Sequence, residues 1–130
     1  RARRMGAERN EGSRGVVVVP LEQRFCAGVE MLQHACYPML AAHEKIGARE
    51  ATTMMEAFPR GQTVAIDLDA GSKVVGMNTG LLIDFSFDEP HHTFQQITSN
   101  LTFANHKPNG EYYYGGDICV HPDYRRRGIG

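Results

Sequence analysis

The run VHPDYRRRGIG at residues 120–130 has residue types and a spacing that could bind a phosphate group. It closes on Gly128 and Gly130, and glycine lets backbone N–H groups face outward with no Cβ in the way. A helix that begins after such a turn adds unpaired N–H groups and the positive end of its dipole. Arg125, Arg126 and Arg127 add positive charge around the same point. The pattern predicts an anion site suited to phosphate or pyrophosphate.

Other interpretations of this run are weaker. The chain has no GxxxxGK[ST] motif, and its glycines do not extend to GxGxxG. A basic nucleic-acid patch usually needs about five to eight residues, and only three arginines stand together here. With 14 basic and 15 acidic residues the net charge is −1, so charge gives no general reason to bind nucleic acid or an acidic membrane.

The cysteines and histidines do not form a recognisable metal or nucleophile motif. Cys26, Cys36 and Cys119 are an odd number without a CxxC pair, which favours a reduced, cytoplasmic compartment. We expect Cys119 to be buried and inert, because no His or Asn partner for a thiol nucleophile can be placed. His91 and His92 are adjacent and match no zinc spacing, so we expect no metal and place them on a solvated loop.

Sequence periodicity predicts the elements that must position these residues. A β-branched strand covers 16–19, and apolar residues then recur at helical spacing until Pro38 ends that helix. A second helix is expected over 41–57 and strands over 63–69 and 74–87, the latter two forming a hairpin with Gly76 and Gly80 as candidate bulges. Five methionines are expected to fill the core, namely Met31, Met39, Met54, Met55 and Met77.

The remaining segments complete one domain. Residues 88–110 form a long connection, for which we expect a substrate-facing role. A last strand covers 111–120; its three tyrosines at 112–114 are expected to pack across strands, with stacking on a ligand as the alternative. The fold class is therefore α+β, in the order strand, helix, helix, three strands and the start of a helix, with a mixed, mainly antiparallel sheet. Residues 1–14 are expected to be a flexible lead-in, and no apolar run reaches membrane-spanning length.

The strand-end run resembles the GNAT acyltransferase superfamily, whose pattern is V-x-P-x-[YF]-[RQ]-x-x-G-x-[GA]. Six positions match: Val120, Pro122, Tyr124, Arg125, Gly128 and Gly130. The order of elements extends the resemblance to residues 15–130, as the N-terminal part of a GNAT α/β/α domain that is cut after this motif. Within the superfamily, the insertion DEPHHTFQQIT and the run YYYGGDICV are similar to a prokaryotic subgroup that is sometimes fused to a carbon–nitrogen hydrolase domain.

The resemblance implies a function and a set of site residues. It implies an acetyl-CoA-dependent N-acetyltransferase in which an amine attacks the thioester directly. The strand backbone at Ile118, Cys119 and Val120 would hold the thioester, and the loop from Arg125 through Arg126, Arg127, Gly128, Ile129 and Gly130 would hold the pyrophosphate. Arg126 departs from the glycine that many relatives carry there.

The attacking amine must lose a proton, since an alkyl amine has a pKa of about 10. Asp117 is the first candidate for that base and Glu111 the second, although Asp117 could equally cap or pair locally. Parts of the family site would lie beyond Gly130, so the chain alone is expected to be inactive. The alternative is a non-catalytic module that binds acyl-CoA or another anion as a sensor or partner platform. The acceptor amine is not identified, and a homo-oligomer is compatible with the sequence.

Overall fold

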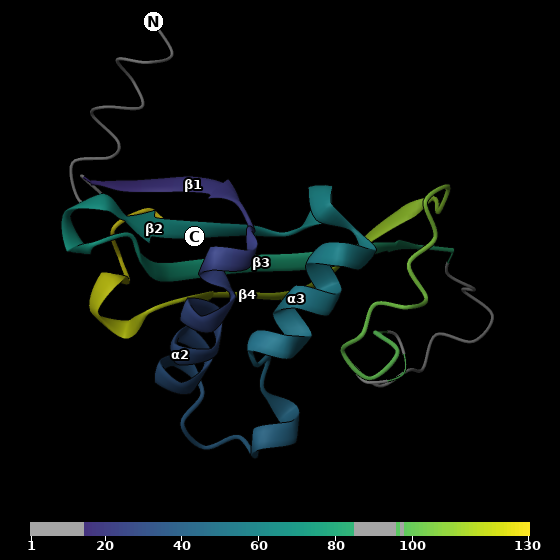
Figure 1. Cartoon of the computed structure of the whole chain (residues 1–130), viewed down its shortest axis with the longest axis horizontal. Coiled ribbons are helices and arrows are strands. Elements are labelled where there is room, and N and C mark those ends of the chain that lie inside the picture. The colour runs from purple at the N-terminus through teal and green to yellow at the C-terminus, as the bar shows by residue number, and fades with distance from the viewer. Residues whose placement is uncertain (1–14, 85–95, 97) are drawn as a thin grey trace, which may run out of the picture.

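The computed structural model describes residues 15–84, 96 and 98–130, which form two layers. One layer is a four-stranded sheet, and the other consists of two helices that lie together on one face of it (Figure 1). The predicted lead-in at 1–14 and the histidines at 91 and 92 lie outside the described residues. The α+β class and the element order are confirmed.

The sheet has the strand order β1-β2-β3-β4, and all three pairings are antiparallel. Its strands are β1 (Val16–Pro20), β2 (Thr63–Asp67), β3 (Lys73–Ile83) and β4 (Tyr112–Val120). A helical turn follows β4, but it is the short 3-10 helix η6 (Pro122–Tyr124). Proline at its first position suits that turn, because proline lacks the N–H that would remain unpaired there.

The two helices are α2 (Cys26–Cys36), which follows the 3-10 turn η2 (Gln23–Phe25), and α3 (Ala48–Ala57). The predicted end of the first helix is confirmed, since Tyr37 caps α2 immediately before Pro38. The second helix was predicted to start near 41, which is wrong. A separate 3-10 turn, η3 (Ala42–Glu44), comes first, and extended Gly47 donates its N–H to Glu50 Oε1 at 3.0 Å as the cap of α3.

The core lies between the helices and the sheet face they cover. Val29 and Leu32 of α2 are fully buried against the layer that contains Val64, Met77 and Leu81. Burial of such aliphatic side chains is the main stabilising contribution of this interface. The methionine expectation is confirmed for Met54 and Met77 but is wrong for two others, because Met31 is 73% exposed and Met39 is 94% exposed. Met31 lies off the buried stripe of α2, and Met39 follows the end of that helix.

Residues 98–103 of the long connection pack into the core, whereas residues 104, 105 and 107–109 are exposed. Phe103 is completely buried and Leu101 is 3% exposed. Ser99, Asn100, Leu101 and Phe103 all have φ between 54° and 68°, a region that non-glycine residues enter at a cost of about 1 kcal/mol or more. Burial of the two apolar side chains offsets that cost, so at 98–103 the connection is part of the fold.

Both glycines proposed as bulges lie next to shifts of strand register. The β2–β3 register shifts between Ala65 and Ile66, opposite Gly76, and the β3–β4 register shifts between Thr79 and Gly80. Gly116 is the extra residue on β4 at the second shift, because Thr79 pairs with Asp117 and Gly80 with Gly115. A bulge of this kind bends the strand and re-aims the side chains that follow it.

Gly80 is held by side chains as well as by strands. The fully buried Gln62 donates its Nε2 to the Gly80 carbonyl at 2.7 Å and accepts the Gly80 N–H on Oε1 at 3.0 Å. The ring of Tyr113 crosses the position where a Cβ of residue 80 would lie, at 2.1 Å from its nearest atoms. Tyr112 and Tyr113 are otherwise exposed, so of the three tyrosines Tyr114 alone packs against the core cluster.

Candidate functional site

The end of β4 presents different side chains to the two faces of the sheet. Asp117 and Cys119 face α2, where both contact Gln33. Ile118 lies between them on the opposite face and is 62% exposed, whereas Cys119 is 8% exposed. This alternation follows from the two-residue repeat of a strand. The candidate base and the candidate thioester contacts therefore lie on the same short segment but point in different directions.

Asp117 is held in place by two neutral donors from α2 and its cap. Gln33 Nε2 donates to Asp117 Oδ2 at 2.8 Å, and the Tyr37 hydroxyl donates to Oδ1 at 2.8 Å. Burial, followed by the hydrogen bond to Asp117, raises the pKa of Tyr37 above its ordinary value. Tyr37 therefore stays protonated and remains a donor, so the carboxylate has a fixed orientation with no ion-pair partner among the described residues.

Gln33 joins this carboxylate to the connection between the helices. Its Oε1 accepts the Ile46 N–H at 3.1 Å, and its side chain is only 2% exposed. An amide can donate and accept at once, which an ionised carboxylate or an ammonium group cannot do. Close by, Thr79 Oγ1 lacks a partner within the described part of the chain, and Thr79 is the register partner of Asp117.

A cavity of about 210 Å³ opens beside Asp117 on the helix side of the sheet. Asp117 and Glu44 supply its charged groups, and the described residues that line it include no basic side chain. Its other walls are side chains of α2, its cap, the helix connection and the bulge: Gln33, Tyr37, Leu40, Ile46 and Gly116. A carboxylate with a fixed orientation at the wall of such a cavity can accept a proton from an amine held inside it.

Cys119 has the surroundings of a structural thiol. Burial is the main cause that raises its pKa, and the Asp117 charge adds to the effect, so the reactive thiolate is disfavoured. Cys36, the last residue of α2, directs its Sγ to the Val120 carbonyl at 3.4 Å. All three cysteines are free. These contacts support the expectation of an inert Cys119.

Glu111 is not brought together with Asp117. It precedes β4 at the far end of the strand, roughly 20 Å away at 3.3 Å per residue. Glu111 is exposed, and its N–H donates to Asp84 Oδ1 at 3.1 Å beside the Lys107–Asp84 ion pair. The arrangement gives Glu111 a local structural contact, and its catalytic role stays an untested prediction.

The backbone groups of the three predicted thioester contacts do not all point to the free edge of β4. His121 N–H donates to Val75 of β3 at 2.8 Å, so the backbone of Cys119, two residues earlier, also faces β3. The backbone groups of Ile118 and Val120 then face away from β3. The outward Val120 carbonyl already accepts Arg125 Nε at 2.9 Å. Ile118 is therefore the position whose backbone is best placed to contact a ligand along this edge.

Two residues of the loop after η6 have left-handed backbone conformations. Arg126 and Gly128 have φ of 64° and 75°. Alternating left-handed residues turn successive N–H groups toward one side. The N–H groups from Arg126 to Gly130 donate no hydrogen bond within the residues that the structure describes. Arg126 occupies a conformation that glycine adopts more readily, which is the physical meaning of its departure from the family pattern.

Side chains anchor this loop to the sheet. Tyr124 OH donates to Asp67 Oδ2 at 2.5 Å, and the Arg127 guanidinium lies 4.9 Å from the centre of the Tyr124 ring. Arg125 and Arg127 therefore have contacts within the fold. Among 125–130, it is chiefly the backbone amides that remain free for an anion.

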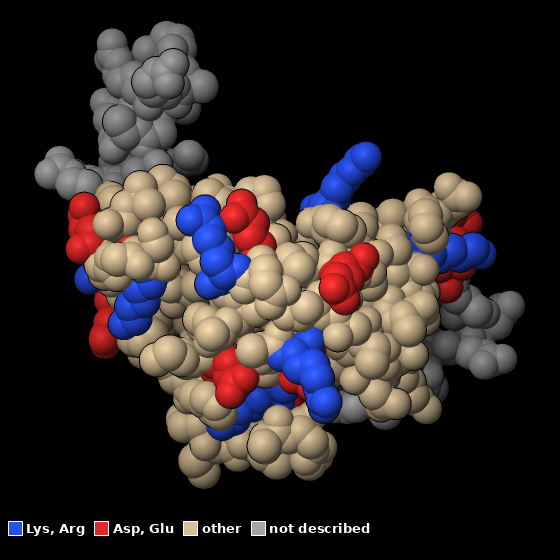
Figure 2. Space-filling model, in the orientation of Figure 1, with Lys and Arg blue, Asp and Glu red and all other residues tan. Residues whose placement is uncertain are grey.

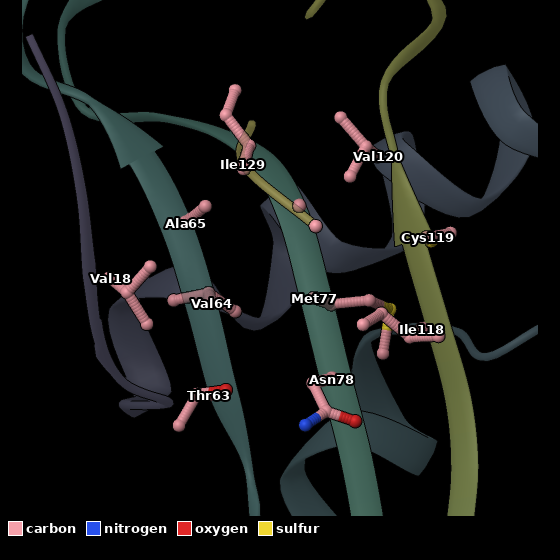
Figure 3. A pocket seen from close by; sticks show the side chains of 12 residues that line it. Val18, Thr63, Val64, Ala65, Met77, Asn78, Ile118, Cys119, Val120 and Ile129 are labelled. Atoms are coloured by element: carbon pink, nitrogen blue, oxygen red, sulfur yellow. The ribbon is translucent and has the colours of Figure 1, made fainter. Parts of the chain in front are cut away.

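On the face opposite the helices, the chain end crosses the sheet. A cavity of about 230 Å³ lies there between β1, β2, β3 and β4. Ile118, Val120 and Ile129 border it, and Figure 3 shows Ile129 above the strands with the helices behind them. The Ile129 side chain comes within van der Waals distance of the position that a Cβ on Gly76 would take, at 3.7 Å.

The wider surface is of mixed charge. Figure 2 shows basic and acidic side chains interspersed over the face that carries the helices. None of the described helices is long and apolar enough to cross a bilayer. Within 15–84, 96 and 98–130, no group of three or more His, Cys, Asp or Glu side chains could hold a metal ion. The expectations of no metal and of a cytoplasmic location stay predictions.

Sequence reasoning missed Gln33, Tyr37 and Glu44. Gln33 offered a signal, because it is a polar residue beside the apolar stripe of α2. Tyr37 and Glu44 offered none, since their position depends on how the chain turns after Pro38.

Comparison with known proteins is consistent with this geometry. No family model matches the chain. It is 34% identical over 100 residues to the uncharacterized N-acetyltransferase YkwB of Bacillus subtilis (strain 168), covering 76% of this chain and 43% of that relative. It is 31% identical over 115 residues to the probable hydrolase YhcX of the same organism, covering 88% of this chain and 21% of that relative. The chain thus spans less than half of the curated relatives it matches.

Two solved structures share the fold. The loading GNATL domain of CurA from Lyngbya majuscula superposes with a TM-score of 0.69 at 16% identity, covering 88% of this chain and 52% of that one. The GphF GNAT-like decarboxylase in complex with isobutyryl-CoA superposes with a TM-score of 0.70 at 17% identity, covering 88% of this chain and 53% of that one. Together with the strand-end motif, these similarities show that the chain has the fold of the GNAT superfamily.

Proposed function

We propose that the protein containing this chain is an acyl-CoA-dependent acyltransferase that moves an acetyl group from acetyl-CoA to a primary amine. The observation that carries the proposal is the Asp117 carboxylate, oriented by Gln33 and Tyr37 at the wall of a cavity beside the exposed edge of β4. The name of the Bacillus relative supports N-acetyl transfer. The isobutyryl-CoA bound to GphF supports an acyl-CoA ligand.

The residues of this chain would divide the work between the two sides of β4. Acetyl-CoA, when bound, supplies a thioester carbonyl that an amine can attack. The backbone of Ile118 would orient that ligand along the strand edge, and the N–H groups of residues 126–130 would hold its pyrophosphate. Asp117 would take the proton that the amine loses as its lone pair forms the new C–N bond, and the C–S bond breaks with the electrons leaving on sulfur.

Titration calorimetry of the complete protein with acetyl-CoA tests the first part. Saturable binding is expected, and no binding at millimolar acetyl-CoA in a folded sample would contradict the proposal. Because the chain spans about half of each solved structure it matches, turnover is proposed for the complete protein, and we expect little from residues 1–130 alone.

The role of Asp117 has its own test. Asp117→Asn should lower kcat about 100-fold or more, the scale of general base catalysis, while the Kd for acetyl-CoA changes less than about twofold. Glu56→Gln, at an exposed position on α3, is the control that should leave both values unchanged. If Glu111→Gln lost activity and Asp117→Asn did not, the assignment of the base would be reversed.

The second candidate is a non-catalytic module that binds acyl-CoA or another anion. The free amides of the loop favour it as much as they favour an enzyme, because binding an anion requires no base. Acetyl-CoA binding without turnover across a panel of small amines, amino acids and peptide N-termini would support this candidate.

A further inference from the structure

A second cavity, of about 340 Å³, lies where β3 begins and β4 ends, on the helix-covered side of the sheet. Its walls come from η2, the length of α2, the start of β3 with the residue before it, and the residue after β4. The basic groups among them are Arg24, Lys73 and His121, and none of the described residues that line the cavity carries a carboxylate. The other lining residues are Phe25, Gly28, Met31, Leu32, Ala35, Ser72 and Val74.

The floor of this cavity is apolar and its rim is cationic. Phe25, Leu32 and Val74 are at most 6% exposed, and Met31 adds a 73% exposed thioether at the edge. Such a combination of an apolar interior and a few polar groups is the common composition of small-molecule sites. An exposed methionine is also an adaptable contact for an aliphatic chain.

The basic groups keep donors available for a ligand. Glu22 Oε1 accepts Arg24 Nε at 2.9 Å, which leaves the terminal guanidinium nitrogens of Arg24 unoccupied within the described chain. Lys73 Nζ lies 5.8 Å from the centre of the Tyr124 ring and has no carboxylate partner among the described residues. Both side chains therefore retain hydrogen-bonding capacity for an anion.

His121 supplies a third donor. Its Nδ1 accepts the Asp123 N–H at 3.1 Å, which fixes the tautomer with the proton on Nε2. The Asp123 carboxylate approaches the same Nδ1 at 4.0 Å, so it does not occupy Nε2. The ring is packed edge-on against Tyr124 and is 16% exposed, which restricts its orientation.

We propose that this cavity is a binding site for a small organic anion, a carboxylate or a phosphate monoester that carries a short aliphatic chain. Arg24, Lys73 and His121 would hold the anionic group, and Phe25, Leu32 and Met31 would contact the chain. The site is separate from the one proposed for acetyl-CoA, because the residues 126–130 loop reaches the opposite face of the sheet. The inference does not depend on the proposed function.

Octanoate and hexyl phosphate are suitable probes for the chain of residues 1–130. In ¹H–¹⁵N spectra, one of them should shift the amides of Gly28 and Ser72 in a saturable way, and the tighter of the two identifies the anionic group. Octylamine, which has the same chain and the opposite charge, should not. Equal binding of octylamine, or no shift with either anion at millimolar concentration, would overturn the proposal.

Two variants locate the binding. Arg24→Gln should lower the affinity for the tighter-binding probe about tenfold, the effect of one charge-assisted hydrogen bond. Arg49→Gln is the matched control, because Arg49 is also exposed and also lies beside a glutamate, at 3.9 Å from Glu50, but on α3. Ala35→Phe should fill the cavity and abolish binding while circular dichroism stays unchanged.

A competition experiment separates this site from the acetyl-CoA site. Saturating acetyl-CoA should leave the probe bound, with the Gly28 and Ser72 shifts unchanged. Displacement of the probe by acetyl-CoA would show that the cavity belongs to the acyl-CoA site and would overturn the inference. Unchanged probe affinity in Arg24→Gln would overturn it as well.

Discussion

The two faces of β4 have opposite characters over four consecutive residues. On the helix face, Asp117 and Cys119 are fixed by Gln33, Tyr37 and burial. On the other face, Ile118 is 62% exposed and its neighbour Val120 borders an open cavity. One strand can therefore carry an immobilised carboxylate toward a cavity on the helix side and an accessible backbone toward the opposite side. Under the proposed function, the two-residue repeat of the strand would separate the group that takes the proton from the backbone that contacts the ligand.

The variant with the largest expected effect on this contrast removes the Gln33 amide, which fixes Asp117 on the helix face. Gln33→Leu leaves the Ile46 N–H without its acceptor and removes a donor to Asp117. We expect the free energy of unfolding to fall by about 2–3 kcal/mol, the cost of buried groups left unpaired, as measured by urea denaturation. Gln23→Leu is the control, because Gln23 makes one exposed bond to Thr52 and should change stability by less than about 0.5 kcal/mol.

The next largest expected effect is a loss of stability at alkaline pH. The pKa of Tyr37 is raised in the folded state, so its stabilising contribution is complete below the ordinary value of 10.0 and is lost as pH rises above it. Relative to Tyr37→Phe, the wild type should lose about 0.5 kcal/mol per pH unit above pH 10, allowing for solvent screening of this half-buried group. Parallel stability curves for the two proteins from pH 9 to 12 would contradict this account.

A substitution in the loop at 126–130 is expected to raise stability instead of lowering it. Arg126→Gly should stabilise the chain by about 1 kcal/mol, because glycine adopts a φ of 64° without strain. Thermal unfolding should show a midpoint roughly 3–5 °C higher. Arg127→Gly should instead lower the midpoint, since it removes the contact with the Tyr124 ring and frees the unfolded chain. A lower midpoint for Arg126→Gly would show that its side chain matters more than its backbone conformation.

The smallest expected change in stability is on the face of β4 opposite the helices. Ile118→Thr should change the free energy of unfolding by less than about 0.5 kcal/mol, because the side chain is mostly exposed already. The same threonine one residue later, in Cys119→Thr, should cost about 1–2 kcal/mol, because the branched side chain must fit a closely packed position that is only 8% exposed. Equal costs at the two positions would remove the distinction between the faces.

Much of this arrangement could be predicted from the sequence, and its limits have physical causes. The strands, the end of α2 at Pro38 and the bulges near Gly76 and Gly80 follow from local periodicity and backbone chemistry. The fixation of Asp117 does not, because Gln33 and Asp117 are 84 residues apart and meet only through packing. The burial of Phe103 could not be predicted either, since it depends on a run of left-handed residues that no local pattern indicated.

Gln62 has a consequence for the dynamics of the sheet. Both backbone groups of Gly80 are paired with the Gln62 amide side chain, while Gly80 keeps its register with Gly115 of β4. Hydrogen exchange at that amide can then occur when a single buried side chain rotates away, without separation of β2 from β3. The Gly80 N–H is therefore a built-in reporter, whose exchange rate measures how often the interior beside the bulge opens while the fold remains intact.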